Sequence, residues 1–308
     1  MTAPVLCIGT RGSPLALAQA DELKRRLATA HAALAAPDAV EIVAIHTSGD
    51  RAGEQPLSAD GGKGLFTKEI EEALLAGRVD LAIHSMKDMM ATLPQGLAIA
   101  ACLPREDPRD ALLSPRAASL AALPAGARLG TSSLRRKALA LHARPDLAVV
   151  PLRGNVGTRL AKLETGNADA TILAVAGLKR LGLAGHITAI LSPDEMLPAP
   201  AQGVLAIEIR ADDARVRNLL TPLDHAVTVA CATAERALLA ALDGSCRTPI
   251  AALATIIDGT LHLDAAIARP DGGALHRTRR DGPVADATAL GRDAGAELKA
   301  RGGPGFFA

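Results

Sequence analysis

The chain has 308 residues, which is long enough for two or three domains that each bury their own core. The formal net charge is only +1, so no overall field attracts a polyanion. With no Trp, no Tyr and only three Phe, the chain also lacks the aromatic surfaces on which single-stranded nucleic acids stack. We therefore expect an aliphatic core and no nucleic-acid partner.

The sequence shows no signal for targeting, for membrane insertion or for metal binding. Residues 1–7 contain no basic segment before a long apolar run, so we predict no signal peptide. No apolar run is long enough to span a membrane. The four cysteines are widely separated and include no Cys-x-x-Cys pair, which fits neither a zinc site nor a disulfide framework. These features predict a reduced cytoplasmic protein with no metal and no membrane partner.

The chain opens with alternating strand and helix patterns. Residues 5–8 form a short apolar run typical of a buried strand, and a glycine-rich turn at 9–14 follows it. Ser13 is placed to cap a helix that begins at Pro14. A second strand is predicted at 40–46. Such alternation favours parallel sheets covered by helices on both faces.

A polar stretch rich in glycine and aspartate, residues 47–64, is predicted to be a mobile loop, and a long loop of this kind is often functional, for instance as a lid. A helix at 66–75, ended by a glycine, and a strand at 79–84 follow it. The strand leads into Lys87 and Asp88, at the strand end where α/β sheets place catalytic groups. An aspartate there is equally suited to cap a helix, so the position alone does not decide its role.

The pattern recurs in the second half of the chain. A strand that begins at Arg128 leads into residues 130–133, which open another helix. Residues 163–172 repeat the leucine, glycine, aspartate and isoleucine of residues 74–83 at the same offsets. We predict a duplicated α/β unit; the alternative is chance similarity between two common helix-to-strand joints.

Two proline-rich segments, at 103–108 and 193–200, are the predicted crossings between the two α/β domains. A strand at 203–209 is expected to return to the first domain. Two such domains are expected to meet at a cleft lined by strand ends and helix N-termini. The predicted domain ranges are 1–100 with the return segment 199–216, then 101–198, and finally 217–308.

The remainder of the chain has a different pattern. A helix, three antiparallel strands and a closing helix are predicted at 227–242, 250–257, 260–268, 274–280 and 286–300. Asp258-Gly259 between apolar runs is a strong hairpin signal, and Gly244 is placed to end the first helix in a left-handed cap. We predict a third domain of the α+β class.

Basic residues gather in one part of this electrically balanced chain. Residues 128–180 contain ten Lys or Arg against three Asp or Glu. Arg135 and Arg136 lie in the first turn of a predicted helix, where cations oppose the helix dipole, so a ligand carboxylate or phosphate would explain them. A solvated basic face is the alternative. The glycine spacing between Arg153 and Arg159 fits neither a P-loop nor a dinucleotide fingerprint, so nucleotide binding is not predicted.

Cys246 stands out among the cysteines because it follows a predicted helix end and lies beside Arg247. A nearby cation lowers the pKa of a thiol, and the thiolate is the nucleophilic form. The other interpretation is a small residue that fills a turn. Cys246 is therefore a candidate site of covalent chemistry.

These motifs resemble the porphobilinogen deaminase family, also called hydroxymethylbilane synthase, and cover nearly the whole chain in the right order. The matching stretches are residues 9–17, 62–66, 84–88, 130–136, 152–159, 173–178 and 202–203, together with the cysteine loop 244–249.

The resemblance implies an α/β fold with two duplicated, type II periplasmic-binding-protein-like domains around a cleft and a smaller C-terminal α+β domain with an antiparallel sheet. It implies a monomeric transferase that deaminates four molecules of the small-molecule substrate porphobilinogen and joins them head to tail into hydroxymethylbilane, for tetrapyrrole synthesis. It also implies a dipyrromethane cofactor attached to Cys246 as a thioether.

By motif, the resemblance assigns roles to residues of this chain. Asp88 would be the catalytic aspartate, whose carboxylate stabilises the positive charge that develops as ammonia leaves. The implied cofactor-binding residues are Lys63, Ser85, Lys87, Thr131, Ser132, Ser133, Arg135, Arg136 and the covalently attached Cys246. The implied substrate-binding residues are Arg11, Ser13, Phe66, Arg153, Arg159 and Gln202.

A few positions depart from the family pattern. Ser245 and Arg247 flank the cysteine where the family has Gly and Gln, Met89-Met90 replaces Val-Pro, and Pro200-Ala201 replaces a pair that contains glycine. None of these changes removes a reacting group. A solute-binding module with the same two-domain cleft is the competing function, but such a module would need neither Cys246 nor Asp88.

Overall fold

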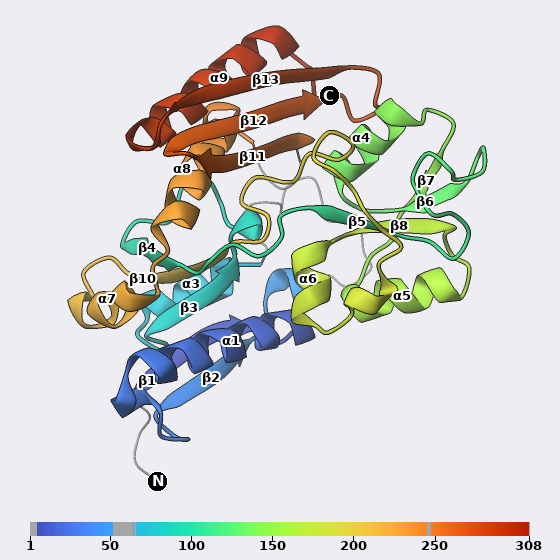
Figure 1. The fold of residues 1–308 in the computed structure, drawn as a ribbon. Coiled ribbons are helices and arrows are strands. Elements are labelled where there is room, and N and C mark those ends of the chain that lie inside the picture. The colour runs from blue at the N-terminus through green and yellow to red at the C-terminus, as the bar shows by residue number, and fades with distance from the viewer. Residues whose placement is uncertain (1–4, 52–63, 65, 245–247, 308) are drawn as a thin grey trace. The chain divides into compact units, whose positions relative to one another are not determined.

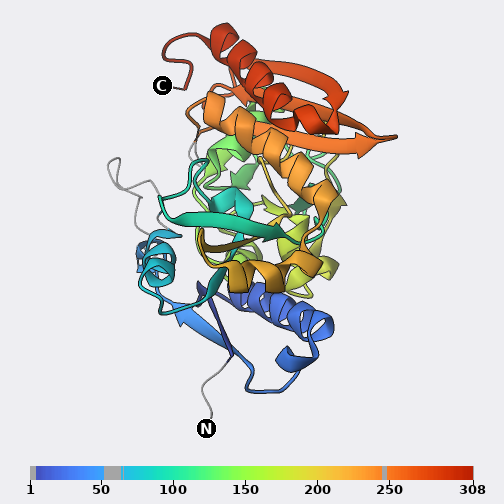
Figure 2. The same cartoon turned by 90° about the vertical axis from the view of Figure 1, so that its left-hand side faces the viewer.

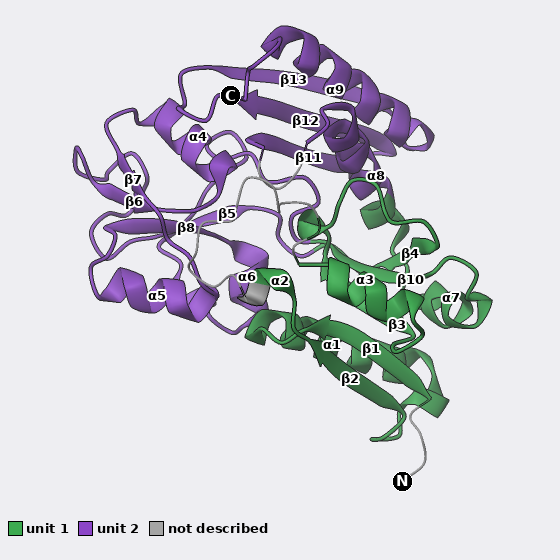
Figure 3. Ribbon diagram, turned by 180° about the vertical axis from the view of Figure 1, so that it is seen from behind, with its two compact units in different colours: residues 1–105, 204–229 green, residues 106–203, 230–308 purple. Residues whose placement is uncertain are grey.

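The computed structural model describes residues 5–51, 64, 66–244 and 248–307. The chain divides into two compact units, one made of residues 1–105 and 204–229, the other of residues 106–203 and 230–308 (Figure 3). Each unit contains its own five-stranded sheet. The domain ranges expected from the sequence stay a prediction.

Unit 1 is built around one five-stranded sheet (Figure 1). Its elements are β1 (Leu6–Arg11), α1 (Pro14–Ala30), η1 (Ala32–Leu34), β2 (Val40–Ile45), α2 (Ser48–Arg51), α3 (Lys68–Leu75), β3 (Leu81–Ser85), η2 (Met86–Asp88), β4 (Leu97–Cys102), β10 (Leu205–Arg210), α7 (Ala214–Leu220) and η4 (Thr221–Leu223). The strand order is β2-β1-β3-β10-β4, with β1 parallel to β2 and β3, and β10 antiparallel to β3 and β4.

The second sheet, in unit 2, repeats this order with the same strand directions. Its elements are β5 (Asp110–Leu113), β6 (Arg128–Gly130), α4 (Leu134–Ala143), β7 (Ala148–Val150), α5 (Val156–Glu164), β8 (Ala170–Ala174), α6 (Val175–Arg180), η3 (Ala184–His186) and β9 (Ala189–Ile190). The order is β7-β6-β8-β5-β9, with β6 parallel to β7 and β8, and β5 antiparallel to its two neighbours. The predicted duplication is confirmed.

The two copies share a joint at the start of their central strands. In the first, Asp80 accepts the backbone N–H of Cys7 at 2.7 Å and its own N–H donates to the carbonyl of Cys7 at 2.9 Å. In the second, Asp169 makes both bonds with Arg128, each at 2.8 Å. The glycine three residues before each aspartate has a positive φ, 69° and 75°, which ends the preceding helix. The repeated residues are therefore those that turn the helix into the strand.

The prediction of parallel sheets was wrong for β10 and β5. Each of these strands begins beside the carboxyl end of its neighbour, because Leu205 lies opposite Ser85 and Asp110 lies opposite Ala174. A strand that enters a sheet from that edge must run antiparallel to it. Both strands follow a segment that crosses between the units, which explains the shared exception.

Helices cover both faces of the sheet in unit 1. Leu23 and Leu27 of α1 belong to the same buried cluster as Ile8, Ile83 and Ile207. The opposite face carries a second cluster, contributed by α3 and by the strand residues that alternate with the first set. Apolar side chains on both faces of these strands thus pack against helices, as the sequence pattern predicts.

The C-terminal part contains α8 (Ala226–Ala241), β11 (Ile250–Ile257), β12 (Thr260–Ala268), β13 (Leu275–Pro283), η5 (Val284–Asp286) and α9 (Ala287–Gly302). The three strands form an antiparallel sheet in the order β11-β12-β13. Asp258 and Gly259 both have positive φ, 48° and 75°, as a two-residue type I′ hairpin turn requires. The predicted hairpin and the α+β class of this part are confirmed.

Helices α8 and α9 approach each other through glycines. A Cβ atom added at Gly291 would lie 2.1 Å from the carbonyl oxygen of Ala234, and one at Gly295 would lie 2.6 Å from Cβ of Ala241. Figure 2 shows the two helices side by side. Only glycine at these positions of α9 permits the observed contact with the alanine-rich surface of α8.

The end of α8 corrects one prediction. The left-handed residue is Asp243, with φ of 51°, and not Gly244. The N–H of Asp243 donates to Ala240 at 3.1 Å and that of Gly244 to Leu239 at 2.9 Å, which is a Schellman motif shifted by one residue. Gly244 is closely packed, because a Cβ there would lie 2.3 Å from Cδ1 of Ile250 and that side chain would have to move.

The stretch expected to be a loop, 47–64, begins with a short helix instead. Helix α2 (Ser48–Arg51) starts where the Ser48 N–H donates to Oε1 of Glu69 at 2.8 Å, so a contact with α3 stabilises its first turn. The rest of the predicted lid, residues 52–63, lies outside the described residues. None of the helices in the described part of the chain is both long and apolar enough to cross a bilayer.

Candidate functional site

The carboxyl ends of β1 and β3 carry the first group of predicted site residues. These strands are parallel neighbours, so Arg11 at the end of β1 and Ser85 at the end of β3 share one edge of the sheet. Lys87 and Asp88 follow in the 3₁₀ turn η2, and both are half-buried. This arrangement gathers two cations, a carboxylate and a hydroxyl at one edge of unit 1.

Aromatic and capping contacts fix two further predicted residues at this edge. The guanidinium carbon of Arg11 lies 4.2 Å from the centre of the Phe66 ring, within the range of a cation–π interaction. Ser13 caps α1, and its hydroxyl accepts the N–H of Ala16 at 3.3 Å. The predicted cap is confirmed, and Phe66 contacts Arg11.

Sequence reasoning missed Gln19, which holds Ser85. Gln19 is buried on α1, and its Nε2 donates to the hydroxyl of Ser85 at 2.9 Å. A glutamine on the inward face of a helix, between Ala16 and Leu23, was the available signal. A buried amide needs a polar partner, and here that partner is the last residue of β3.

Three buried ionisable side chains, His84, Glu208 and Glu71, lie close to one another next to this edge of the sheet. His84 Nε2 is 3.1 Å from Oε2 of Glu208, on the face of the sheet that α3 covers, and Glu71 of α3 is buried nearby. Burial raises the pKa of Glu71, and the negative charge of Glu208 raises it further, against the opposing effects of Thr67 and His84. Oε1 of Glu71 and Oε1 of Glu208 lack hydrogen-bond partners among the described residues. A proton on Glu71 would supply a donor to this cluster.

We predict that Glu71→Gln stabilises the protein increasingly as the pH rises above about 4.5, the ordinary pKa of glutamate. Above that value the unfolded wild-type chain releases the proton that its folded state retains, so wild-type stability falls until the folded pKa is passed. The amide of the variant cannot titrate. Melting temperatures measured across pH 4 to 8 check this, with Glu164→Gln, a change of an exposed glutamate in α5, as the control; parallel curves for wild type and Glu71→Gln would contradict it.

In unit 2 the hydroxyls after β6 bond mainly to the backbone. Ser133 caps α4 by accepting the N–H of Arg136 at 3.4 Å, as Ser13 caps α1 in the other copy. Ser132 donates to the carbonyl of Leu152 at 3.2 Å, and Thr131 Oγ1 accepts the N–H of Ser133 at 3.2 Å. These bonds fix the shape of the turn that leads into the two arginines.

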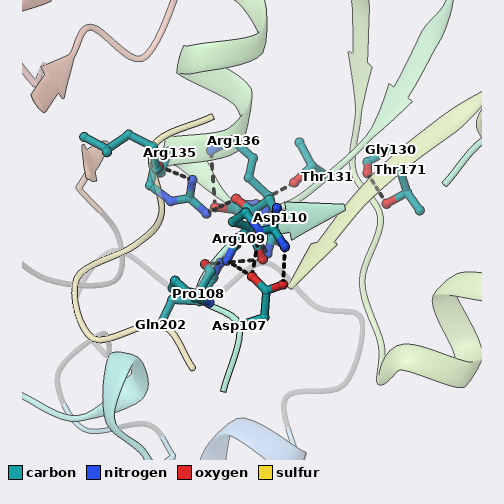
Figure 4. A network of polar contacts seen from close by, with 12 residues as sticks. Asp107, Pro108, Arg109, Asp110, Gly130, Thr131, Arg135, Arg136, Thr171 and Gln202 are labelled. Carbon is teal, nitrogen blue, oxygen red and sulfur yellow. Dashed lines mark hydrogen bonds and ion pairs between the residues drawn. The ribbon is translucent and has the colours of Figure 1, made fainter. Parts of the chain in front are cut away.

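Arg135 and Arg136 are not part of an exposed basic wall (Figure 4). Only 5% and 6% of their surfaces are exposed, and both pair with Asp110, which is fully buried. Arg135 Nη2 donates to Oδ2 at 2.7 Å, and Arg136 Nη2 donates to Oδ1 at 2.8 Å. The two explanations offered from the sequence, a ligand anion or a solvated basic face, both omitted Asp110, because no local pattern indicates that this carboxylate lies between the arginines.

Gln202 belongs to the same network. It is 1% exposed, and its Nε2 donates to Oδ1 of Asp110 at 2.9 Å and to the carbonyl of Pro108 at 2.7 Å. The preceding residue, Ala201, has φ of 59°, a left-handed conformation that favours glycine. The departure from glycine noted at Pro200-Ala201 therefore falls on a strained backbone position, which the Ala201 N–H stabilises by donating to Glu235 at 2.5 Å.

The remaining predicted residues divide into those that are described and those that are not. Arg153 and Arg159 are half-buried around the N-terminus of α5, where Arg159 Nε donates to the carbonyl of Gly154 at 2.9 Å. Lys63 and Cys246 lie outside the described residues. Within the described ranges, His, Cys, Asp and Glu side chains form no cluster of three or more that would hold a metal ion.

Comparison with known families accounts for nearly all of the chain. Residues 6–218 match the model of the porphobilinogen deaminase dipyrromethane cofactor-binding domain, and residues 229–300 match that of the porphobilinogen deaminase C-terminal domain. The chain belongs to the porphobilinogen deaminase family. It is therefore an enzyme of tetrapyrrole synthesis whose first matched domain binds a dipyrromethane cofactor.

Curated porphobilinogen deaminases agree with this assignment. The chain is 54% identical over 300 residues to the enzyme of Nitrobacter hamburgensis, covering 97% of this chain and 94% of that protein. It is 52% identical over 303 residues to the chloroplastic enzyme of Oryza sativa subsp. japonica, covering 97% of this chain and 85% of that protein. The similarity thus spans both matched domains.

Solved structures with a more distant likeness are solute-binding proteins. A nutrient-binding protein from Burkholderia cenocepacia bound to methionine is 16% identical, with a TM-score of 0.44 over 70% of this chain and 90% of that one. A periplasmic substrate-binding protein of an ABC transporter from Coxiella burnetii is also 16% identical, with a TM-score of 0.44 over 75% and 96%. Within this chain, the two five-stranded sheets share one strand order.

The described residues fit a cofactor that carries carboxylates. Arg135 and Arg136 share a single counter-charge, Asp110, and Arg136 Nε is buried without a hydrogen-bond partner among the described residues. A buried positive charge with a spare donor suits an anionic group. This donor set fits the cofactor named by the family match.

Proposed function

We propose that the chain joins four porphobilinogen molecules head to tail, releasing one ammonia for each, and frees hydroxymethylbilane by hydrolysis. Each porphobilinogen carries an acetate and a propionate, so the growing product accumulates carboxylates. The observation that carries the proposal is the buried Arg135–Asp110–Arg136 set, in which the described residues leave one positive charge uncompensated. That charge is matched to a carboxylate-bearing ligand.

The proposed cofactor-binding residues are those that the family motif assigns. A dipyrromethane group attached to Cys246 supplies the free pyrrole carbon from which the chain grows. Ser85 and Lys87 at the edge of unit 1 would bind its polar groups, and Lys63 is assigned the same role by motif. In unit 2 the residues proposed to bind its carboxylates are Thr131, Ser132, Ser133, Arg135 and Arg136.

Asp88 is the proposed catalytic residue. Loss of ammonia from porphobilinogen leaves positive charge on the substrate, and a nearby carboxylate stabilises that charge. The half-buried position of Asp88 in η2 favours this role, because partial exclusion of water strengthens a charge interaction. The same carboxylate would accept or return a proton at the pyrrole N–H.

Substrate carboxylates are proposed to bind the remaining cations. Arg11, held against Phe66, and Ser13 would act from unit 1. Arg153 and Arg159 would act from unit 2, and Gln202 would act through its bonds to Asp110 and Pro108 as well as on substrate. The cytoplasmic location and the monomeric state expected from the sequence stay predictions.

Ammonia release tests the proposal directly. Purified protein incubated with porphobilinogen should release four ammonia molecules for every hydroxymethylbilane formed, with both measured over the same interval. A solute-binding module of the same fold would bind porphobilinogen and release no ammonia. Binding without ammonia release would therefore contradict the proposed function and support the competitor.

A further inference from the structure

Asp110 occupies a built position at the edge of the sheet in unit 2. It is the first residue of β5 and lies opposite Ala174, the last residue of β8, so it sits at the carboxyl edge where Thr131 follows β6. The side chain is fully buried. A carboxylate in this place must be surrounded by donors, since burial of an unpaired charge is strongly unfavourable.

Three donors from two segments surround this carboxylate (Figure 4). Oδ2 accepts from Arg135 at 2.7 Å, and Oδ1 accepts from Arg136 at 2.8 Å and from Gln202 at 2.9 Å. Burial alone would raise the pKa of Asp110, but the charges of Arg135 and Arg136 outweigh burial and hold this pKa far below its ordinary range. Asp110 is therefore ionised at neutral pH. Charge-assisted bonds at these distances fix the orientation of both guanidinium groups.

The same network also binds a segment of the chain that contacts the C-terminal sheet. Arg135 also donates through Nη1 to the carbonyl of Leu197 at 2.7 Å. The carbonyl of the next residue, Pro198, accepts the N–H of Ala252 in β11 at 2.9 Å. The orientation of Arg135 is thus tied on one side to Asp110 and on the other to the sheet that follows the cysteine loop.

The charges in this network do not balance. Asp110 contributes −1 and the two arginines +2, so the buried set has a net charge of +1. Arg136 Nε is buried and has no hydrogen-bond partner among the described residues. One further negatively charged acceptor would complete the set. Asp110, which is fully buried, holds the two arginines in place for such an acceptor.

We propose that Asp110 is a positioning residue, which fixes Arg135 and Arg136 so that they receive a carboxylate of the cofactor as it is built. This inference rests on the proposed function. It assigns Asp110 no contact with cofactor or substrate. Asp110 acts by orienting the two arginines, and the rate of cofactor loading depends on that orientation.

Asp110→Asn tests the inference, because it keeps the side-chain shape and removes the charge. Cofactor-free protein is made in cells that cannot synthesise porphobilinogen, then mixed with porphobilinogen, and the fraction of chains that gain mass is followed with time. We expect loading at least about tenfold slower than in wild type. The matched control is Asp107→Asn, which removes another arginine-paired carboxylate of the same segment, bonded to Arg109 at 2.7 Å and expected to leave loading unchanged.

Each outcome decides the inference. Loading is measured well below the melting temperature of Asp110→Asn. A wild-type rate of loading overturns the inference even if the melting temperature is lowered, because a purely structural role of Asp110 would give that result. If Asp110→Asn does not fold, Asp110→Glu keeps the negative charge but moves the carboxylate by one methylene relative to Arg135 and Arg136; slowed loading then supports the inference and a wild-type rate overturns it. Wild-type protein that gains no mass contradicts the proposed function instead.

Discussion

Asp88→Asn should retain the covalent mass of the cofactor and lose at least about 99% of its turnover, since a positioned acid–base carboxylate contributes roughly 10²–10⁴-fold to a rate. The new amide occupies the same place at the end of η2, where the structure puts Asp88 half-buried beside the carboxyl edge of the sheet. It cannot carry the negative charge that we propose stabilises the deaminated substrate. The measurement is ammonia release per minute, together with the intact mass of the same sample.

The control for this variant is Asp212→Asn, an exposed aspartate in the turn before α7. It makes the same chemical change at a residue with no proposed role in binding or catalysis and should leave turnover unchanged. Near-normal turnover in Asp88→Asn would contradict the assigned role of Asp88. Loss of the cofactor mass in this variant would instead place Asp88 among the residues that load the cofactor.

Gly291→Ala should destabilise the protein by about 1–3 kcal/mol or more, the usual effect of adding atoms to a filled interior. The added Cβ would lie 2.1 Å from the carbonyl oxygen of Ala234 on α8, and backbone atoms cannot rotate away as a side chain would. Helices α8 and α9 must therefore separate. Denaturant unfolding of the variant and of wild type measures the difference.

Gly185→Ala is the matched control for this change. Gly185 also lies in a helical turn, its φ is not in the left-handed region, and no atom lies within 4 Å of an added Cβ. It should unfold at the same denaturant concentration as wild type or slightly above it. Equal stabilities for Gly291→Ala and Gly185→Ala would contradict the close packing of α8 and α9, in which an added Cβ at Gly291 lies 2.1 Å from the carbonyl oxygen of Ala234.

The duplication was predictable because its signals are local. The leucine, glycine and aspartate repeated in 74–83 and 163–172 are the residues that end a helix, turn the chain and begin a strand. Asp80 and Asp169 then make the same pair of backbone bonds in each copy. A pattern whose chemistry acts within ten residues is visible in the sequence alone.

The Asp110 network was not predictable because its partners are brought together only by the fold. Asp110 opens a strand of four residues, and Gln202 lies ninety-two positions later. The sequence showed an excess of cations around Arg135 and Arg136, but not which acid enters between them. For the same reason, the parallel or antiparallel direction of β5 and β10 depended on where the chain crosses between the units.

The intact mass of the purified, denatured protein, measured beside that of Cys246→Ser, tests the covalent cofactor and its attachment site. We expect wild type to exceed its sequence mass by two porphobilinogen units less two ammonia molecules, and Cys246→Ser to show no excess. Wild type that lacks the excess, and still lacks it after incubation with porphobilinogen, would contradict the proposed function. An excess that persists in Cys246→Ser would contradict the assignment of Cys246 as the attachment site.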